Sequence, residues 1–194
     1  MTDKIGVVGA RVHRIIQCGM KSYACYPKGG QEEMQQATHA FFDLGTTTGY
    51  AISIGPGSLL SGVWDFSPKR TESYGMRFLK FRRKLEDAYL KFRFETVYYE
   101  EVQRHVGTYA AHIYGGLKAE LTAFCEVHGI PYEGIGVGTI KKSFTGSGNA
   151  KKAEMIAEAQ RRGYMTDDDN EADAIALAEY ARARGTVGEY GRKK

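Results

Sequence analysis

Residues 40 to 54 constrain the fold more than any other stretch of this chain. They read AFFDLGTTTGYAISI, in which an apolar run ends in one carboxylate and two glycines bracket three threonines. Such a run is typical of a buried strand, and Gly45 and Gly49 turn the chain sharply back into a second strand. We therefore expect Asp43 at the end of a strand near the middle of a sheet.

The residues next to Asp43 in the sequence do not determine its chemical role. A carboxylate is costly to bury unless a positive or hydrogen-bonding group meets it. Asp43 could therefore cap its own turn, contribute to an ATP site or bind a metal ion. The choice depends on what the rest of the chain places beside it.

The composition is that of a folded domain whose charge is unevenly distributed. Of the 194 residues, 42% are hydrophobic and 26% are charged, which indicates a single domain with a substantial core. The formal net charge is +4, with basic residues concentrated at positions 77–93 and acidic residues at 167–173. A basic surface beside an acidic pocket suits a metal-dependent enzyme that acts on a polyanion. A solvated helix face and an acidic helix start are the alternative explanation.

Cysteine usage and hydropathy predict the compartment. Cys18, Cys25 and Cys125 are too few and too irregularly spaced for a disulfide framework or a zinc site, which favours a reducing environment. No apolar run approaches the length of a membrane span, and the first residues lack a clear signal peptide. We expect a soluble, cytoplasmic protein without a membrane partner.

The pattern divides the chain into three parts. Residues 1–38 show no sustained period and contain Pro27, Gly29 and Gly30, so we expect a poorly structured N-terminal extension. Met34 stands just ahead of the first strand, and a mis-assigned start codon with the domain beginning near Met34 is a second explanation. Residues 39–184 are expected to form the folded domain, and 185–194 a flexible basic tail.

The folded part is expected to be an α/β domain with a mixed five-stranded sheet flanked by helices. Its first three strands should form an antiparallel meander, and the long helix that follows has an apolar stripe that we assign to the core, with a dimer seam as the alternative. The strands are expected at 40–43, 50–54, 59–66, 96–102 and within 131–140, and the helices at 73–93, 109–128, 150–162 and 170–184.

Acidic residues stand at the ends of these elements. Asp43 ends the first strand, and Glu100 and Glu101 end the fourth. Because successive strand residues point to opposite faces, only one of Glu100 and Glu101 can face the same way as Asp43.

The last helix carries a further acidic cluster. Asn170 and Asp173 are three residues apart and share a helix face, and Asp169 and Asp173 form a competing pair. Capping of the helix explains residues 167–169 but not an Asp one turn inside it. Three oxygen ligands from two strand ends and a helix would suit Mg²⁺ or Mn²⁺. Two such ions about 4 Å apart would hold a phosphodiester between them, as in a nuclease.

Four segments together resemble the RuvC-type Holliday-junction resolvases of the RNase H-like superfamily, and more specifically their phage-associated relatives. In chain order they are FDLGTTTGYAI, YYEEV, KKSFTGSGNAKKAEMI and NEADAIALA, within residues 39–184. One such motif is weak, but four in order are a strong indication. The resemblance implies an RNase H-like nuclease domain that acts as a homodimer on Holliday junctions or other branched DNA, in a bacterial or phage-infected cell. It also implies two Mg²⁺ per active site, with Mn²⁺ able to substitute, and products with 5′-phosphate and 3′-hydroxyl ends.

The resemblance assigns metal and catalytic roles to particular residues. Asp43, Glu100 and Asp173 match the acids that hold the metal ions. Asn170 stands where the family has Asp or His, which makes it a neutral ligand at best. Glu101 falls where the family often has Gln, and we expect it to point away.

The basic candidates would contact DNA. Lys141 and Lys152 match residues that meet the backbone near the scissile phosphate, and Lys152 is also a catalytic candidate. A lysine offers a compact charge for phosphate oxygens, and nearby glycines let backbone amides approach a phosphate. Further DNA-binding candidates are Lys151, Arg82 and Arg83 as phosphate contacts, Arg104 and His105 as phosphate or substrate contacts, and Tyr109 as a stacking residue.

Two other functions compete with the nuclease. The sequence Asp-Leu-Gly-Thr-Thr also opens the nucleotide site of actin-like ATPases and sugar kinases, but the roughly 150 residues after Asp43 are too few for the second domain such folds need. A catalytically weakened branched-DNA-binding module is the other alternative. The three matching acids argue against it, whereas Asn170 keeps it open.

Overall fold

The structure, a computed structural model, describes residues 7–8, 11–12, 15–18, 21–24, 38–55, 57–104 and 107–185. The chain divides into two compact units, Met1–Gln35 and Gln36–Lys194. In the first unit two antiparallel pairs are described, β1 (Val7–Val8) with β2 (Arg11–Val12) and β3 (Ile15–Cys18) with β4 (Lys21–Ala24). The remainder of the predicted N-terminal extension, including Met34, and the tail from residue 186 lie outside the described residues.

The second unit contains the expected mixed sheet of five strands, in the order β7-β6-β5-β8-β9. Its first three strands, β5, β6 and β7, are antiparallel, while β8 and β9 run parallel to β5, the central strand. This is the predicted topology of a mixed sheet that begins with an antiparallel meander. The strands are β5 (His39–Asp43), β6 (Thr47–Gly55), β7 (Ser58–Asp65), β8 (Thr96–Glu101) and β9 (Tyr132–Gly136).

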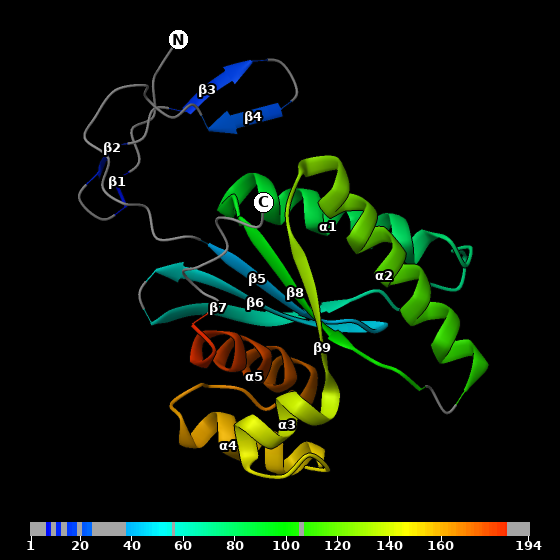
Figure 1. The fold of residues 1–194 in the computed structure, drawn as a ribbon. Helices are drawn as coiled ribbons and strands as arrows, with labels where there is room; N and C mark the ends of the chain where they lie inside the picture. The colour runs from blue at the N-terminus through cyan, green and yellow to red at the C-terminus, as the bar shows by residue number, and fades with distance from the viewer. Residues whose placement is uncertain are drawn as a thin grey trace. The chain divides into compact units, whose positions relative to one another are not determined.

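Helices cover both faces of this sheet (Figure 1). One face carries α1 (Met76–Phe92) and α2 (Thr108–His128), and the other carries α5 (Asp169–Ala183), against which α3 (Val137–Thr145) and α4 (Lys152–Arg161) pack. None of the helices in the described part of the chain is long and apolar enough to cross a membrane.

The alternation of side chains along β5 and β8 produces two cores. Phe42 and Tyr99 belong to the core under α1 and α2, whereas Phe41 and Tyr98 belong to the core under α5. Because the period of a strand is two residues, the residue that follows Phe42 at the end of β5 faces α5. The sheet therefore directs Asp43 toward the last helix.

The helical stripes predicted from the sequence form the core on the α1–α2 side. Phe81, Leu85 and Ala88 of α1 are buried, which confirms the assignment of this stripe to the core. The face of α2 is buried in the same way, through Ile113, Leu117, Leu121 and Phe124.

One helix was not predicted. The fifth strand, expected within 131–140, ends at Gly136, and Val137–Thr145 forms α3. Gly134, Gly136 and Gly138 lower the local helix propensity, so the segment looks like strand and loop. Ile140 and Phe144, four residues apart, are buried in the α5-side core, and this tertiary packing stabilises the helix.

Candidate active site

The turn after Asp43 is closed by a threonine. The hydroxyl of Thr48 donates to the carbonyl oxygen of Gly45 at 2.7 Å and accepts from the Gly45 amide at 3.3 Å. In the described part of the chain no hydrogen bond joins the Asp43 carboxyl to its own turn, and the neighbouring Glu100 raises its pKa instead. The structure thus gives no support to Asp43 as the cap of its own turn.

The two glutamates at the end of β8 face opposite ways. Glu100 is only 7% exposed and lies on the α5 side beside Asp43. The Glu101 carboxylate lies on the α2 side, where Lys118 Nζ approaches its two oxygens at 2.6 and 2.7 Å. The expected orientation of Glu101 is confirmed, and the ion pair with Lys118 links α2 to the sheet.

A glycine brings the start of α5 directly onto the sheet. A Cβ atom added at Gly49 of β6 would overlap the backbone carbonyl of Asn170. Since only glycine permits this approach, Gly49 determines how close the first turn of α5 lies to β5 and β6.

Hydrogen bonds hold the same helix start in place. Asp168 is the N-cap and accepts from the amides of Asn170 at 2.8 Å and Glu171 at 3.2 Å. The hydroxyls of Ser61 and Thr166 donate to Glu171 at 2.6 and 2.8 Å. These contacts fix the orientation of α5, and therefore of Asp173 one turn further on.

Asp43, Glu100 and Asp173, which we call the acid cluster, interact electrostatically. Burial raises the pKa of Asp43 well above its usual value, and the neighbouring Glu100 and Asp173 raise it further. Burial and then Glu100 raise the pKa of Asp173 to about 7. Lys141 on α3 opposes both shifts, which places its ammonium group near both aspartates.

Among the described residues, one oxygen of the acid cluster is left without a hydrogen bond. Asp173 Oδ1 is buried and has no hydrogen-bond partner in the described structure. Within the described ranges, however, no three Asp, Glu, His or Cys side chains converge tightly enough to hold an ion as they stand. Like charges repel one another, so a cation would be needed to draw the carboxylates together. Carboxylate oxygens and an unsatisfied buried oxygen fit a hard divalent cation.

The remaining metal and catalytic candidates lie at the edge of the cluster. Lys152 is exposed, and its Nζ forms an ion pair with Asp169 Oδ2 at 2.5 Å. Asn170 donates from Nδ2 to Asp168 Oδ1 at 3.1 Å, which leaves its Oδ1 as the atom able to bind a metal. Asp169 and Asp173, the competing pair, therefore have different surroundings. Asp169 pairs with Lys152, whereas Asp173 belongs to the acid cluster.

The proposed DNA contacts are spread over several elements. Arg82 and Arg83 lie on α1, which covers the face of the sheet away from the acid cluster, and Arg82 binds Glu120 at 2.7 Å. The structure does not bring these two arginines to the acids. Arg104 is exposed after β8, Lys151 is exposed at the start of α4, Tyr109 is in the first turn of α2, and His105 lies outside the described residues.

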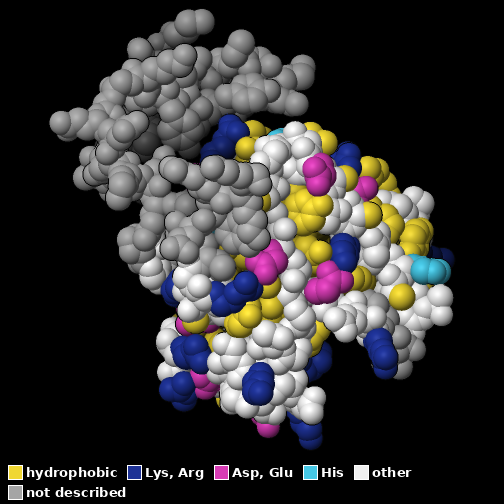
Figure 2. Space-filling model, viewed as in Figure 1, with side chains coloured by type: hydrophobic (Ala, Val, Ile, Leu, Met, Phe, Trp, Pro, Cys, Tyr) yellow, Lys and Arg dark blue, Asp and Glu magenta, His cyan; other side chains and the backbone are white. Residues whose placement is uncertain are grey.

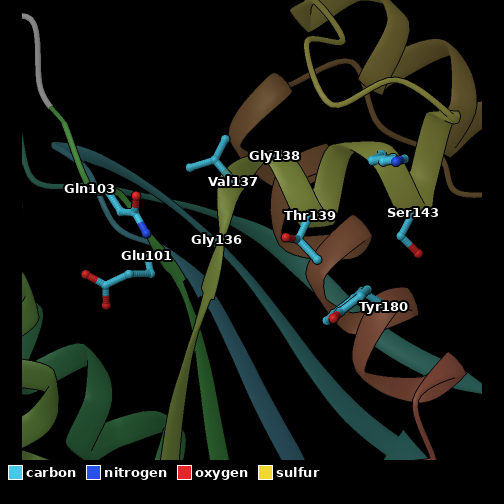
Figure 3. A pocket seen from close by; sticks show the side chains of 9 residues that line it. Glu101, Gln103, Gly136, Val137, Gly138, Thr139, Ser143 and Tyr180 are labelled. Carbon is cyan, nitrogen blue, oxygen red and sulfur yellow. The ribbon is translucent and has the colours of Figure 1, made fainter.

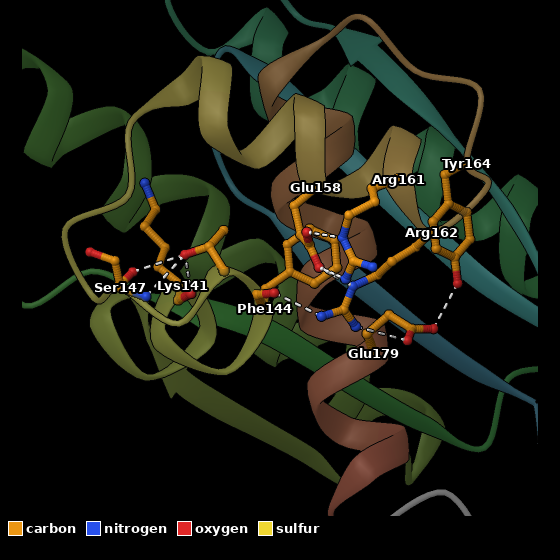
Figure 4. Close-up of polar contacts among 9 residues, drawn as sticks. Lys141, Phe144, Ser147, Glu158, Arg161, Arg162, Tyr164 and Glu179 are labelled. Atoms are coloured by element: carbon orange, nitrogen blue, oxygen red, sulfur yellow. Dashed lines mark hydrogen bonds and ion pairs between the residues drawn. The ribbon is translucent and has the colours of Figure 1, made fainter.

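Basic side chains also lie around α3 and α4, where Figure 2 shows Lys and Arg on the surface. Arg162 anchors this region: it donates to the Phe144 carbonyl at 2.7 Å and to Glu158 at 2.7 Å, and approaches Glu179 of α5 at 3.4 Å (Figure 4). One guanidinium thus connects α3, α4 and α5. It holds the helix of Lys141 against the helix of Asp173.

A cavity of about 710 Å³ lies between the end of β8 and the start of α3 (Figure 3). It is bordered by the end of β8, the start of α3 and Tyr180 of α5. None of the three acids lines it, so the cavity is not part of the acid cluster. Its lining residues are Glu101, Gln103, Gly136, Val137, Gly138, Thr139, Lys142, Ser143 and Tyr180.

Arg77 was missed by the sequence analysis as a residue near the site. It is 2% exposed and reaches Thr46 in the turn after Asp43 and Tyr109 at the start of α2. The sequence does contain a signal for its burial. Arg77 precedes Phe81 and Leu85 at intervals of four residues, so it lies on the same buried face of the helix.

Comparison with solved structures confirms the fold that the sequence motifs suggested. Thermus thermophilus RuvC in complex with a Holliday junction substrate is 20% identical with a TM-score of 0.65, over 78% of this chain and 96% of that one. A second Thermus thermophilus RuvC structure is 21% identical with a TM-score of 0.60, over 77% and 97% of the two chains. The yeast mitochondrial Holliday junction resolvase Ydc2 is 14% identical with a TM-score of 0.56, over 80% and 82%. No protein-family model and no curated protein sequence matches the chain.

Proposed function

We propose that this protein is an endonuclease that resolves Holliday junctions or other branched DNA by metal-dependent phosphodiester hydrolysis. The observation that carries the proposal is the acid cluster at the ends of β5 and β8, completed by α5 and containing a buried, unpartnered Asp173 oxygen. The fold shared with RuvC and Ydc2 supports the same function.

Asp43, Glu100 and Asp173 would hold the divalent ions, with Asn170 Oδ1 as a neutral fourth ligand. Mg²⁺ is the expected ion, two per site, and Mn²⁺ should substitute for it. When bound, such ions would activate water and stabilise the leaving oxygen, giving 5′-phosphate and 3′-hydroxyl ends.

The lysines have separate roles in this proposal. Lys141, already beside the two aspartates, would bind the scissile phosphate. Lys152 would leave Asp169 for the DNA backbone, a modest cost because this ion pair is exposed to solvent. Cutting two strands of a junction symmetrically would require a homodimer, which supplies two active sites.

A cleavage assay tests the proposal with a matched pair of variants. Purified protein is incubated with a synthetic four-way junction, a fork and a linear duplex, in Mg²⁺ and in chelator. We expect cleavage of the branched substrates in Mg²⁺ only. Glu100→Gln should abolish it, whereas Glu101→Gln, a change at the next residue but on the other face of the sheet, should retain most of it.

The same assay separates the alternatives. Junction binding without cleavage in Mg²⁺ or Mn²⁺ would identify a binding module that has lost its chemistry. Absence of both binding and cleavage, together with ATP binding measured by calorimetry, would favour the actin-like alternative. Equal loss of activity in the two glutamate variants would contradict the role given to Glu100.

A further inference from the structure

The strand β8 carries its glutamates beyond the end of its neighbour β5. The last pair in the ladder between these two strands is Phe42 with Tyr99, whereas the ladder between β8 and β9 continues to Glu101 and Gly136. Glu100 therefore lies where one side of β8 has no strand partner in the described sheet. Buried main-chain groups need hydrogen-bond partners, and Glu100 is only 7% exposed.

The open side of β8 is the side toward β5. The Val97 amide donates to the Pro131 carbonyl at 3.0 Å, next to β9, so the odd-numbered residues of β8 direct their main-chain groups toward β9. The Glu100 carbonyl and the Val102 amide therefore point toward β5. Continued pairing would place Leu44 opposite these two groups, but β5 ends one residue before it.

The hydroxyl of Tyr114 takes the place of the missing strand residue. Tyr114 comes from α2 and is itself 7% exposed. Its hydroxyl donates to the Glu100 carbonyl at 2.9 Å, and the Val102 amide donates to the same oxygen at 3.1 Å. A strand residue would meet these groups with its own amide and carbonyl. One hydroxyl can do both, because it is a donor and an acceptor.

This contact supports Glu100 from behind. The ring of Tyr114 lies in the core under α1 and α2, whereas the Glu100 carboxylate lies on the α5 side with the other acids. Like charges in the acid cluster repel one another, which favours displacement of the strand end that carries Glu100. The hydroxyl fixes the main chain of that strand end and leaves the carboxylate oxygens free to bind an ion.

We propose that Tyr114 is a positioning residue, which holds Glu100 in the place where it binds a divalent ion. This inference rests on the proposed function and adds to it a residue that touches neither the ion nor the DNA. Loss of a group that orients a metal ligand typically lowers metal affinity by roughly 10–100-fold.

The test is Tyr114→Phe, which keeps the buried ring and removes only the hydroxyl. We expect Mn²⁺ binding, measured by calorimetry without DNA, to weaken about tenfold. In the junction-cleavage assay, the half-saturating Mg²⁺ concentration should rise by a similar factor. The rate at saturating Mg²⁺ should change less than about twofold, because the bound ion restores the position of Glu100.

Two control variants separate positioning from a general loss of stability. Glu101→Gln weakens the other contact between α2 and the end of β8, the ion pair with Lys118. Tyr164→Phe removes a hydroxyl that donates to Glu179 at 2.7 Å, so it also costs one hydrogen bond. Both variants should bind Mn²⁺ as the wild type does.

Hydrogen exchange tests the contact in the wild-type protein itself. In chelator, the Val102 amide should exchange slowly although it lies beyond the last residue of β8, because the Tyr114 hydroxyl protects it. In Tyr114→Phe its exchange, followed by NMR, should be at least about ten times faster. The Val97 amide, bonded to Pro131, should exchange equally slowly in both proteins.

The outcomes separate this inference from the proposed function. Wild-type Mn²⁺ affinity in Tyr114→Phe, or an equal loss of affinity in Tyr164→Phe, would overturn the positioning role even if the protein cleaves junctions. Rapid exchange of the Val102 amide in the wild-type protein would overturn it as well, whether or not the variant folds. A wild-type protein that binds no Mn²⁺ and cleaves no junction would overturn both proposals.

Discussion

Gly49 shows how a single residue determines the geometry of the candidate site. The sequence places it at the end of a Gly-Thr-Thr-Thr-Gly run, where its evident role is to turn the chain. In the structure its main role is different: it lets the Asn170 backbone of α5 lie against β6. This role depends on a partner more than 100 residues away, so the local sequence could not predict it.

Substitution of Gly49 by Ala should therefore destabilise the domain. The added methyl group would push α5 from the sheet, and we expect the free energy of unfolding to fall by at least about 2 kcal/mol in a denaturant titration. Gly115→Ala is the control, since that helical glycine has open space around its Cβ position. It should raise the free energy of unfolding by up to about 1 kcal/mol. Equal effects of both substitutions would contradict the close packing at Gly49.

Asp173 should make the metal-free protein less stable at alkaline pH. Its pKa is raised from 3.8 to about 7, so the folded state binds this proton more tightly than the unfolded chain does. Stability is therefore lost as the pH rises from about 4 to above 7. At pH 8 in chelator, Asp173→Asn should raise the melting temperature by about 3 °C or more, and the gain should disappear at pH 4 and below.

Two controls accompany this measurement. Asp167→Asn, at an exposed position just before α5, should change the melting temperature by less than about 1 °C. Mg²⁺ should stabilise the wild-type protein and not Asp173→Asn, because only the former retains the full set of acids. A lower melting temperature for Asp173→Asn than for the wild type, in chelator at pH 8, would show that the Asp173 carboxylate does not destabilise the metal-free protein.

At the scale of elements, the strands were easier to predict than the connections between them. Alternation along β5 and β8 correctly predicted that only one of Glu100 and Glu101 faces the same way as Asp43, because the period of a strand is independent of its surroundings. The choice of Glu100 came from the resemblance. The helix α3 was missed because it is short and the glycines in and before it lower the helix propensity of the segment. Its stability comes from tertiary packing. Arg77 was counted among the basic residues, although helical spacing places it on the buried stripe.

The helices α3, α4 and α5 should depend on Arg162. It contacts Phe144, Glu158 and Glu179. Arg162→Met would leave the Phe144 carbonyl without this donor and would remove one of the donors to each of the two glutamates. We expect the free energy of unfolding to decrease by about 1–3 kcal/mol, measured by denaturant titration. Arg161→Met is the matched control: Arg161 is exposed and binds only Glu158, so its loss should cost less than about 0.5 kcal/mol. Similar losses in both variants would contradict the anchoring role of Arg162.

At the scale of the whole molecule, the fold was predicted from four motifs in order, while the path of the DNA was not. The motifs lie at the ends of elements that the sheet topology must bring together, which is why their order was informative. From the sequence, the basic residues of α1 were expected to bind the DNA backbone. In the structure, α1 covers the face of the sheet away from the acid cluster. The direction in which a helix presents its charges follows from packing, and the charge pattern alone does not reveal it.

DNA binding should show the salt dependence of phosphate contacts. The affinity for a junction and for a linear duplex, measured by fluorescence anisotropy in chelator, should fall linearly on a log–log plot against salt concentration. Lys141→Ala and Lys152→Ala should each reduce the magnitude of the slope by about 1, whereas Arg83→Ala, on the opposite layer, should reduce it less. A slope near zero would contradict binding through the phosphate backbone.

The most direct test of the central claim is Mn²⁺ binding, measured by calorimetry without DNA. If the acid cluster holds divalent ions, the wild-type protein binds Mn²⁺, and Asp43→Asn, Glu100→Gln and Asp173→Asn each weaken binding at least about tenfold. Glu101→Gln should bind as the wild type does. Unchanged Mn²⁺ binding in the three acid-cluster variants, or an equal loss in Glu101→Gln, would contradict the account.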